Sequence, residues 1–184
     1  MMNPAYNTYR VFVPAQAVGA NLIYFDLFNP TTSPWQLDVY SVIPIVSGAV
    51  AVTGVVAVDL FLNRTSAVGT GGTAMTFNGT SFTAMTLAKM TGAGQDVTEI
   101  SGRLTPTGGA TAGAVIAGCS VFSEETNAGT YLSGAGLIDL VRRGYQGGAP
   151  MMVQQGSGLS VVQGSVASVG NIGFDVIFQA RPKG

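Results

Sequence analysis

Acidic side chains are the residues of this chain best suited to catalysis, because the sequence contains no histidine and only one cysteine. Without histidine, the Ser-His-Asp and Cys-His arrangements and the commonest metal ligand are absent together. Glu124 and Glu125 are adjacent, and Asp96 lies near Glu99. A glycosidase needs two carboxyl groups about 5–9 Å apart across a cleft, whereas neighbouring residues of a turn usually point into solvent. We therefore predict that the chain is not an enzyme.

Cofactor and metal motifs are also missing from the sequence. A single cysteine cannot complete a zinc or iron–sulfur ligand set. The chain has no GxxxxGK[ST] loop, and its glycine-rich segments do not follow the GxGxxG spacing. Cys119 lies in the apolar run VIAGCSVF, which predicts a small buried side chain rather than a reactive thiol. We expect no cofactor and no metal.

The longest apolar stretch, residues 36–64, dominates the predicted architecture. No charge occurs between Asp38 and Asp59, so by length the stretch would suffice to cross a membrane. Val and Ile dominate it, Pro44 interrupts its first half, and both flanks alternate with period two, which favours strands. We predict a pair of strands joined near Ser47-Gly48 at the centre of a sheet, and no membrane partner.

Other alternating segments predict further short strands at residues 9–13, 22–28, 99–104, 115–123, 136–141, 150–154, 159–163 and 172–180. The first of these stops at Pro14, which is typical of an edge strand. Asn78-Gly79 predicts a hairpin that pairs Phe77 with Thr80 and Met75 with Phe82; a loop that only turns at Asn78 is the alternative. Residues 85–90 are too few to distinguish one or two helical turns from another structure.

A chain of 184 residues with many short strands and frequent turns predicts one domain. We expect an all-β fold: a single-domain antiparallel β-sandwich, jelly-roll-like, over residues 1–184. Residues 1–8 and 181–184 are expected to be flexible or partner-contacting tails.

The composition indicates subunit contacts. Charged residues make up 9% of the chain, against about 25% in an ordinary soluble protein, and the centres of subunit interfaces are depleted of Lys, Glu and Asp. The eight Lys and Arg residues are scattered and the net charge is −1, so we expect no nucleic-acid partner. The first 13 residues lack the pattern of a signal peptide, and we therefore expect synthesis in a cytoplasm.

Exposed aromatic and basic side chains are the candidates for an interface. We take Trp35, Tyr9, Phe12, Arg142, Arg143 and Tyr145 as interface candidates. Trp35, the only tryptophan, is expected to be a core or interface anchor rather than a platform for a ligand. The Arg142-Arg143 pair is suited to acidic groups of a partner, and a solvated rim is the alternative.

Two segments resemble a known group of proteins. Residues 27–42, LFNPTTSPWQLDVYSV, are a strand ending in Phe-Asn-Pro, a small polar loop and an alternating strand. Residues 156–179, GSGLSVVQGSVASVGNIGFDVIFQ, are a Gly-rich strand, a small-residue linker and an alternating terminal strand. Together they resemble the small β-sandwich virion proteins of tailed bacteriophages, which include capsid decoration, or cement, proteins.

The resemblance implies a structural virion protein without enzymatic activity. It implies a jelly-roll subunit, often a homotrimer, that sits on a phage capsid and bridges neighbouring subunits of the major capsid protein. The alternative is a phage tail, fibre or lectin-like module that binds a cell-surface glycan or receptor, with Trp35, Tyr131 and Tyr145 as candidates for the sugar contact. A trimeric ligand similar to C1q or tumour necrosis factor agrees with the fold but not with the missing signal peptide.

Overall fold

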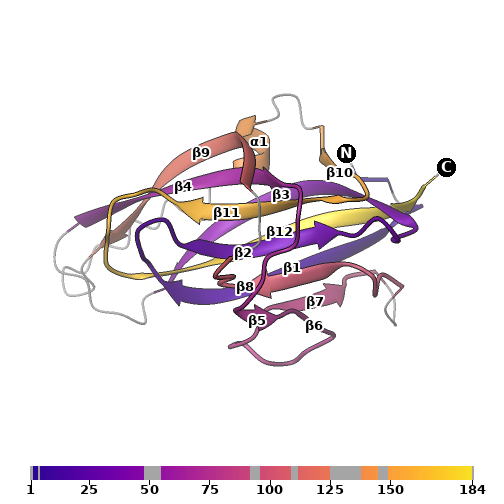
Figure 1. Cartoon of the computed structure of the whole chain (residues 1–184), viewed down its shortest axis with the longest axis horizontal. Helices are drawn as coiled ribbons and strands as arrows, with labels where there is room; N and C mark the ends of the chain where they lie inside the picture. Colours follow the sequence, from indigo (N-terminus) through magenta and orange to yellow (C-terminus); the bar gives the residue numbers. More distant parts are fainter. Residues whose placement is uncertain are drawn as a thin grey trace.

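Two β-sheets packed face to face make up nearly the whole of the computed structural model (Figure 1). The structure describes residues 2–3, 5–47, 55–91, 96–108, 112–124, 138–144 and 149–183. These residues contain twelve strands and one short helix, and the strand pairs are antiparallel apart from one. The predicted all-β sandwich is therefore confirmed.

The first sheet contains six strands among the described residues. In spatial order they are β10 (Met151–Val153), β3 (Trp35–Ser47), β12 (Asn171–Pro182), β1 (Asn7–Ala17), β7 (Thr86–Lys89) and β6 (Thr76–Phe77). The pair of β6 with β7 is parallel.

The second sheet also has six strands in the described part of the chain. In order they are β5 (Thr73–Ala74), β8 (Ser101–Leu104), β2 (Ile23–Asn29), β11 (Ser157–Gln163), β4 (Val55–Thr65) and β9 (Ala112–Glu124). The strands predicted at residues 22–28, 99–104, 115–123, 150–154, 159–163 and 172–180 are confirmed as β2, β8, β9, β10, β11 and β12.

The strand order is that of a jelly roll. If β5 to β8 are set aside, consecutive strands alternate between the sheets except for β4 and β9, which pair with each other. This gives β10-β3-β12-β1 in the first sheet and β2-β11-β4-β9 in the second. The four short strands β5 to β8 all come from the chain between β4 and β9, and they extend both sheets on the same side, beyond β1 and beyond β2.

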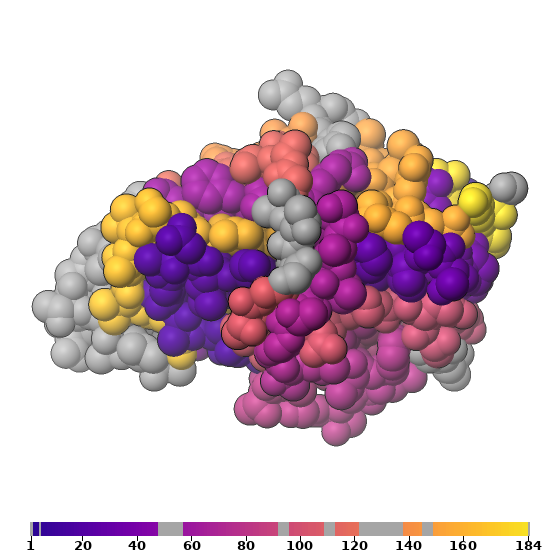
Figure 2. Space-filling model, viewed as in Figure 1, coloured from indigo at the N-terminus to yellow at the C-terminus, as the bar shows by residue number. Residues whose placement is uncertain are grey.

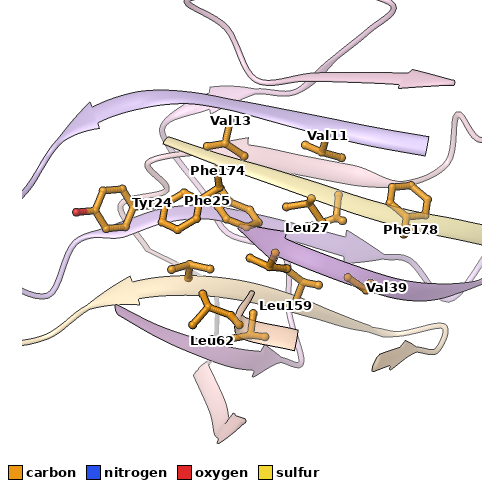
Figure 3. Close-up of a cluster of buried hydrophobic side chains, with 14 of the residues drawn as sticks. Val11, Val13, Tyr24, Phe25, Leu27, Val39, Leu62, Leu159, Phe174 and Phe178 are labelled. Carbon is orange, nitrogen blue, oxygen red and sulfur yellow. The ribbon is translucent and has the colours of Figure 1, made fainter. Parts of the chain in front are cut away.

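The core lies between the two sheets and consists of alternate side chains of the long strands. Phe174 of β12 connects the two layers, because its ring contacts Tyr24 at 5.2 Å and Phe25 at 5.5 Å between centroids, both on β2 (Figure 3). Aromatic rings at these separations add to the free energy gained from burial alone.

The prediction that residues 36–64 form a paired strand unit is wrong in one respect. Both strands exist, as β3 and β4, but they belong to different sheets. β3 pairs with β12 along its length, whereas β4 lies between β11 and β9. Alternation along a strand fixes which face is buried but not which strand is its neighbour. The predicted turn at Ser47-Gly48 lies partly outside the described residues.

β1 is a central strand, not the predicted edge strand, and it continues past Pro14 to Ala17. The pairing of β1 with β12 is interrupted between Val13 and Gln16, and such a bulge accommodates a proline, which has no N–H to donate. A Cβ on the facing Gly173 would lie 2.6 Å from the Val13 carbonyl oxygen, so glycine is required there.

The predicted hairpin at Asn78-Gly79 is also wrong. Asn78 has a φ of +51°, as a turn requires, but the chain before it forms β6, which runs parallel to β7. The alternative, a loop that turns at Asn78, fits this geometry. Residues 86–89 of the undecided segment form the strand β7.

The strand predicted over residues 136–141 is replaced, in its described part, by the helix α1 (Leu140–Gly144). The Asp139 carboxylate accepts hydrogen bonds from the backbone of Val141 and Arg142, which is helix N-capping. α1 packs against β3 of the first sheet and against β9, the edge strand of the second sheet. No helix among the described residues has the length and hydrophobicity needed to span a membrane.

The tails expected to be loose are partly ordered in the sheet. Asn7 and Thr8 belong to β1, and Arg181 and Pro182 belong to β12. The amide of Gln179 donates to the carbonyl of Asn3 at 2.9 Å, so the two ends of the chain lie together (Figure 1).

The segment between β4 and β5, residues 66–72, crosses the outer face of the second sheet. Gly69 donates its backbone N–H to the carboxylate of Asp26, a fully buried residue of β2. In Figure 2 this segment is part of the magenta ridge that runs across the face in view. We name residues 66–72 the strap.

Candidate interaction surfaces

One part of the outer face of the first sheet is apolar. Phe12 on β1, Ile177 on β12, and Ile43 and Ile45 on β3 alternate with core residues and therefore point away from the core. Ile45 is 38% exposed and the other three are half-buried. We name these four residues, together with Phe82, the Phe12 face.

Phe82 lies over the outer side of Phe12. Its ring meets that of Phe12 edge-on, with 6.3 Å between centroids, while 84% of the residue remains exposed. Single exposed apolar residues are common on proteins, but this one is continuous with the apolar residues of the sheet. The result is a continuous apolar patch that draws on β1, β3, β12 and Phe82, and such patches are candidates for interaction sites.

An ion pair lies beside the Phe12 face, next to the ring of Phe12. Arg10 and Asp175 lie on neighbouring strands, and the guanidinium donates from Nε at 2.9 Å and from Nη2 at 2.8 Å to the two carboxylate oxygens. The same guanidinium lies 5.7 Å from the centroid of the Phe12 ring. A two-point Arg–carboxylate pair has fixed geometry, so this face presents no unpaired charge from these two residues.

Trp35 lies at a different place, in a pocket near the two chain ends. The pocket has a volume of about 300 Å³ and is lined by Trp35, Gln36, Gln154, Gln155 and Lys183. Trp35 also packs against the core. Its indole Nε1 is buried and has no hydrogen-bond partner among the described residues.

Tyr9 is a core residue, which removes it from the interface candidates. It has no exposed surface, and its ring stacks on Phe178 at 5.3 Å between centroids. Burial, together with the negative charge of Asp96, raises the pKa of the Tyr9 hydroxyl to about 12. The alternating pattern of β1 places Tyr9 with Val11 and Val13 on the inner face and Phe12 on the outer one.

Arg142 and Arg143 are exposed on α1, as expected for partner contacts or a solvated rim. Arg142 Nε lies 3.5 Å from the Asp139 carboxylate, and Arg143 Nη1 donates to the Gly118 carbonyl at 3.3 Å. Cys119 is buried and free, as predicted, and burial raises the pKa of its thiol. Tyr145 and Tyr131 lie outside the described residues.

Of the carboxylates considered for catalysis, Asp96 and Glu99 are described, and they have different partners. Asp96 forms a 2.6 Å ion pair with Lys89, whose hydrogen bond lowers the pKa of the Asp96 carboxyl. The Glu99 carboxylate accepts from the backbone of Thr98. Among described residues, no three His, Cys, Asp or Glu side chains gather at a possible metal position. Glu125 and the side chain of Glu124 are outside the part of the chain that the structure describes.

Four of the predicted interface candidates, Phe12, Trp35, Arg142 and Arg143, are at least partly accessible at the surface, but the sequence did not predict which residues surround them. Phe82 was expected in a hairpin, and the pocket residues Gln36, Gln154, Gln155 and Lys183 carry no sequence signal, because separate parts of the chain contribute them. Comparison with protein families, curated proteins and solved structures finds no match to this chain.

Proposed function

We propose that this chain is a structural virion protein that decorates or cements a bacteriophage capsid by bridging neighbouring capsid subunits. The apolar Phe12 face is the observation that carries the proposal. An apolar surface of this kind on a chain with 9% charged residues favours contact with protein over contact with water.

A second copy of the same chain is the proposed occupant of the Phe12 face. The face offers a partner apolar side chains and an ion pair whose charges already neutralise each other, so it favours a surface that is itself apolar and weakly charged. The same face on another copy meets this requirement. An interface of standard size buries about 800 Å² on each partner, and closed symmetry, a trimer in our proposal, limits the assembly to a discrete unit.

The contact with the major capsid protein would then be multivalent. Each oligomer presents several copies of the same surface, so modest affinities combine through avidity. Arg142 and Arg143 on α1 are the exposed cations proposed to meet acidic groups of the capsid. No chemical step is needed in this mechanism.

Gradient sedimentation of the native source lysate tests the proposal. Fractions are analysed by mass spectrometry for this 18.8 kDa chain. We expect it to sediment with large particles, at a copy number comparable with that of the main shell protein. Recovery only near the top of the gradient, separate from every particle, would contradict a virion role.

A further inference from the structure

The pocket that contains Trp35 is built from three parts of the chain that meet at one end of the sandwich. Trp35 and Gln36 begin β3, Gln154 and Gln155 lie between β10 and β11, and Lys183 follows β12. The Lys183 backbone N–H donates to the Pro34 carbonyl at 3.0 Å, which ties the end of β12 to the start of β3. The pocket is therefore part of the folded sandwich rather than a gap between loose ends.

Hydrogen bonds hold several of the lining groups in position. The Asn29 amide donates to the Trp35 carbonyl at 2.8 Å, and the Gln155 amide donates to the Ser33 carbonyl. Lys183 Nζ donates to Gln155 Oε1 at 2.8 Å. Such preorganisation lowers the entropic cost of binding a ligand.

Several polar groups of the pocket retain hydrogen-bonding capacity. Gln36 Nε2 donates to Asp38 at 3.2 Å, and Gln36 Oε1 accepts no hydrogen bond from a described residue. The exposed Gln154 side chain makes no hydrogen bond with the described residues, and the Lys183 ammonium has three donors. The indole Nε1 of Trp35 is buried, so a ligand would meet the carbon surface of this ring.

An indole surface surrounded by primary amides matches the chemistry of a sugar. Each amide offers both a donor and an acceptor, which complements neighbouring hydroxyl groups that also donate and accept. The apolar C–H face of a sugar ring packs on an aromatic surface. Among the described residues that line the pocket, Lys183 is the only cation, and Arg181 nearby is paired with Asp38 at 2.9 Å. A highly charged phosphate ligand is therefore disfavoured.

We propose that this pocket binds a hexose-sized saccharide, with Trp35 as the stacking surface and Gln36, Gln154 and Lys183 as hydrogen-bonding groups. The volume of about 300 Å³ lies at the lower end of the range for small-molecule sites, which suits one sugar ring rather than a long oligosaccharide. The site is separate from the Phe12 face and does not depend on the proposed virion role.

Tryptophan fluorescence tests this proposal directly, because Trp35 is the only tryptophan of the chain. The full chain is titrated with methyl glycosides of glucose, galactose, mannose and N-acetylglucosamine, and with glucuronic acid. We expect at least one sugar to shift the emission saturably, with a Kd on the order of 1 mM. Saturation-transfer NMR on the same samples detects binding that leaves the emission unchanged.

Variants of the lining residues show whether the response comes from the pocket. Gln154→Ala and Lys183→Met should each weaken binding of the responding sugar by at least about tenfold, while Phe82→Ser, on the Phe12 face, should leave it unchanged. The proposal is overturned if no sugar gives a signal by either method at concentrations on the order of tens of millimolar. It is also overturned if both pocket variants bind as the unmodified chain does.

Discussion

The rings of Phe82 and Phe12 meet edge-on at 6.3 Å between centroids, although Phe82 is 84% exposed. Phe12 belongs to a central strand, and Phe82 comes from the part of the chain that also supplies the short strands β5 to β8. The insertion between β4 and β9 thus adds an aromatic side chain to the outer face of the first sheet.

Phe82→Ser should weaken self-association by at least about tenfold, because an apolar anchor at the centre of an interface accounts for a large share of its binding free energy. The free energy of unfolding should change by no more than about 1 kcal/mol, since the side chain is exposed and has one aromatic contact. Size-exclusion chromatography with light scattering measures the first quantity, and urea unfolding measures the second.

Val166→Ser is the matched control for this experiment. Val166 is 70% exposed, lies in the connection between β11 and β12, and is not one of the Phe12-face residues. Its substitution should leave the oligomer intact. If Phe82→Ser and Val166→Ser shift the association equally, general surface hydrophobicity explains it and the Phe12 face does not.

Phe174→Ala should destabilise the protein by about 3–5 kcal/mol. The ring of Phe174 is fully buried and contacts Tyr24 and Phe25 of the opposite sheet, so its removal leaves a cavity between the layers. Urea unfolding gives the value, with Val169→Ala, at a 51% exposed position, as the control. A loss below about 1 kcal/mol would mean that the sheets do not pack through this ring.

Much of the fold was predictable because alternation along a strand is a local property. β1 and β12 carry clear period-two patterns, and the sandwich class follows from the number and length of the short apolar segments. The neighbouring strands of β3 and β4 were not predictable, because β3 and β4 lie in one apolar stretch of the sequence although they belong to different sheets. The position of Pro14 in a central strand depends on a bulge opposite Gly173, which is a tertiary feature.

The residues that line the Trp35 pocket could not be predicted as a group from the sequence. Trp35 itself stood out as the only tryptophan, but its neighbours Gln154, Gln155 and Lys183 lie more than a hundred positions later in the chain. Only the jelly-roll topology, in which β10 and β12 flank β3, brings these side chains to one end of the sandwich.

Asp26 should make stability depend on pH. Burial raises the pKa of its carboxyl above the usual 3.8, although the Gly69 amide and Arg103 oppose the shift. Between 3.8 and the raised pKa, the folded state binds more protons than the unfolded state, so the free energy of unfolding falls as pH rises through this window. The stabilisation is therefore present at the acidic end and is lost above the folded-state pKa.

Asp26→Asn removes this titration and should flatten the dependence across the same window. Urea unfolding of both proteins between about pH 4 and pH 7 measures the two slopes. Equal slopes in the two proteins would show that the buried carboxyl of Asp26 contributes nothing to the pH dependence.

Gly69→Ala should destabilise the protein by about 1–3 kcal/mol through overpacking. A Cβ at this position of the strap would lie 2.5 Å from Asp26 Oδ2 and 2.6 Å from Pro106 Cβ. Gly19→Ala is the control, because its Cβ would meet only Leu22 Cβ at 3.8 Å, an ordinary contact. Thermal unfolding compares the two variants, and similar midpoints would contradict close packing of the strap on β2.

Sedimentation velocity of the purified chain, over a wide range of concentration, tests most directly whether it is a self-associating subunit. We predict a discrete species at a multiple of 18.8 kDa, a trimer in our proposal, that persists on dilution. A single species of 18.8 kDa at the highest concentration would show that the Phe12 face does not bind a second copy, and would contradict the proposed assembly.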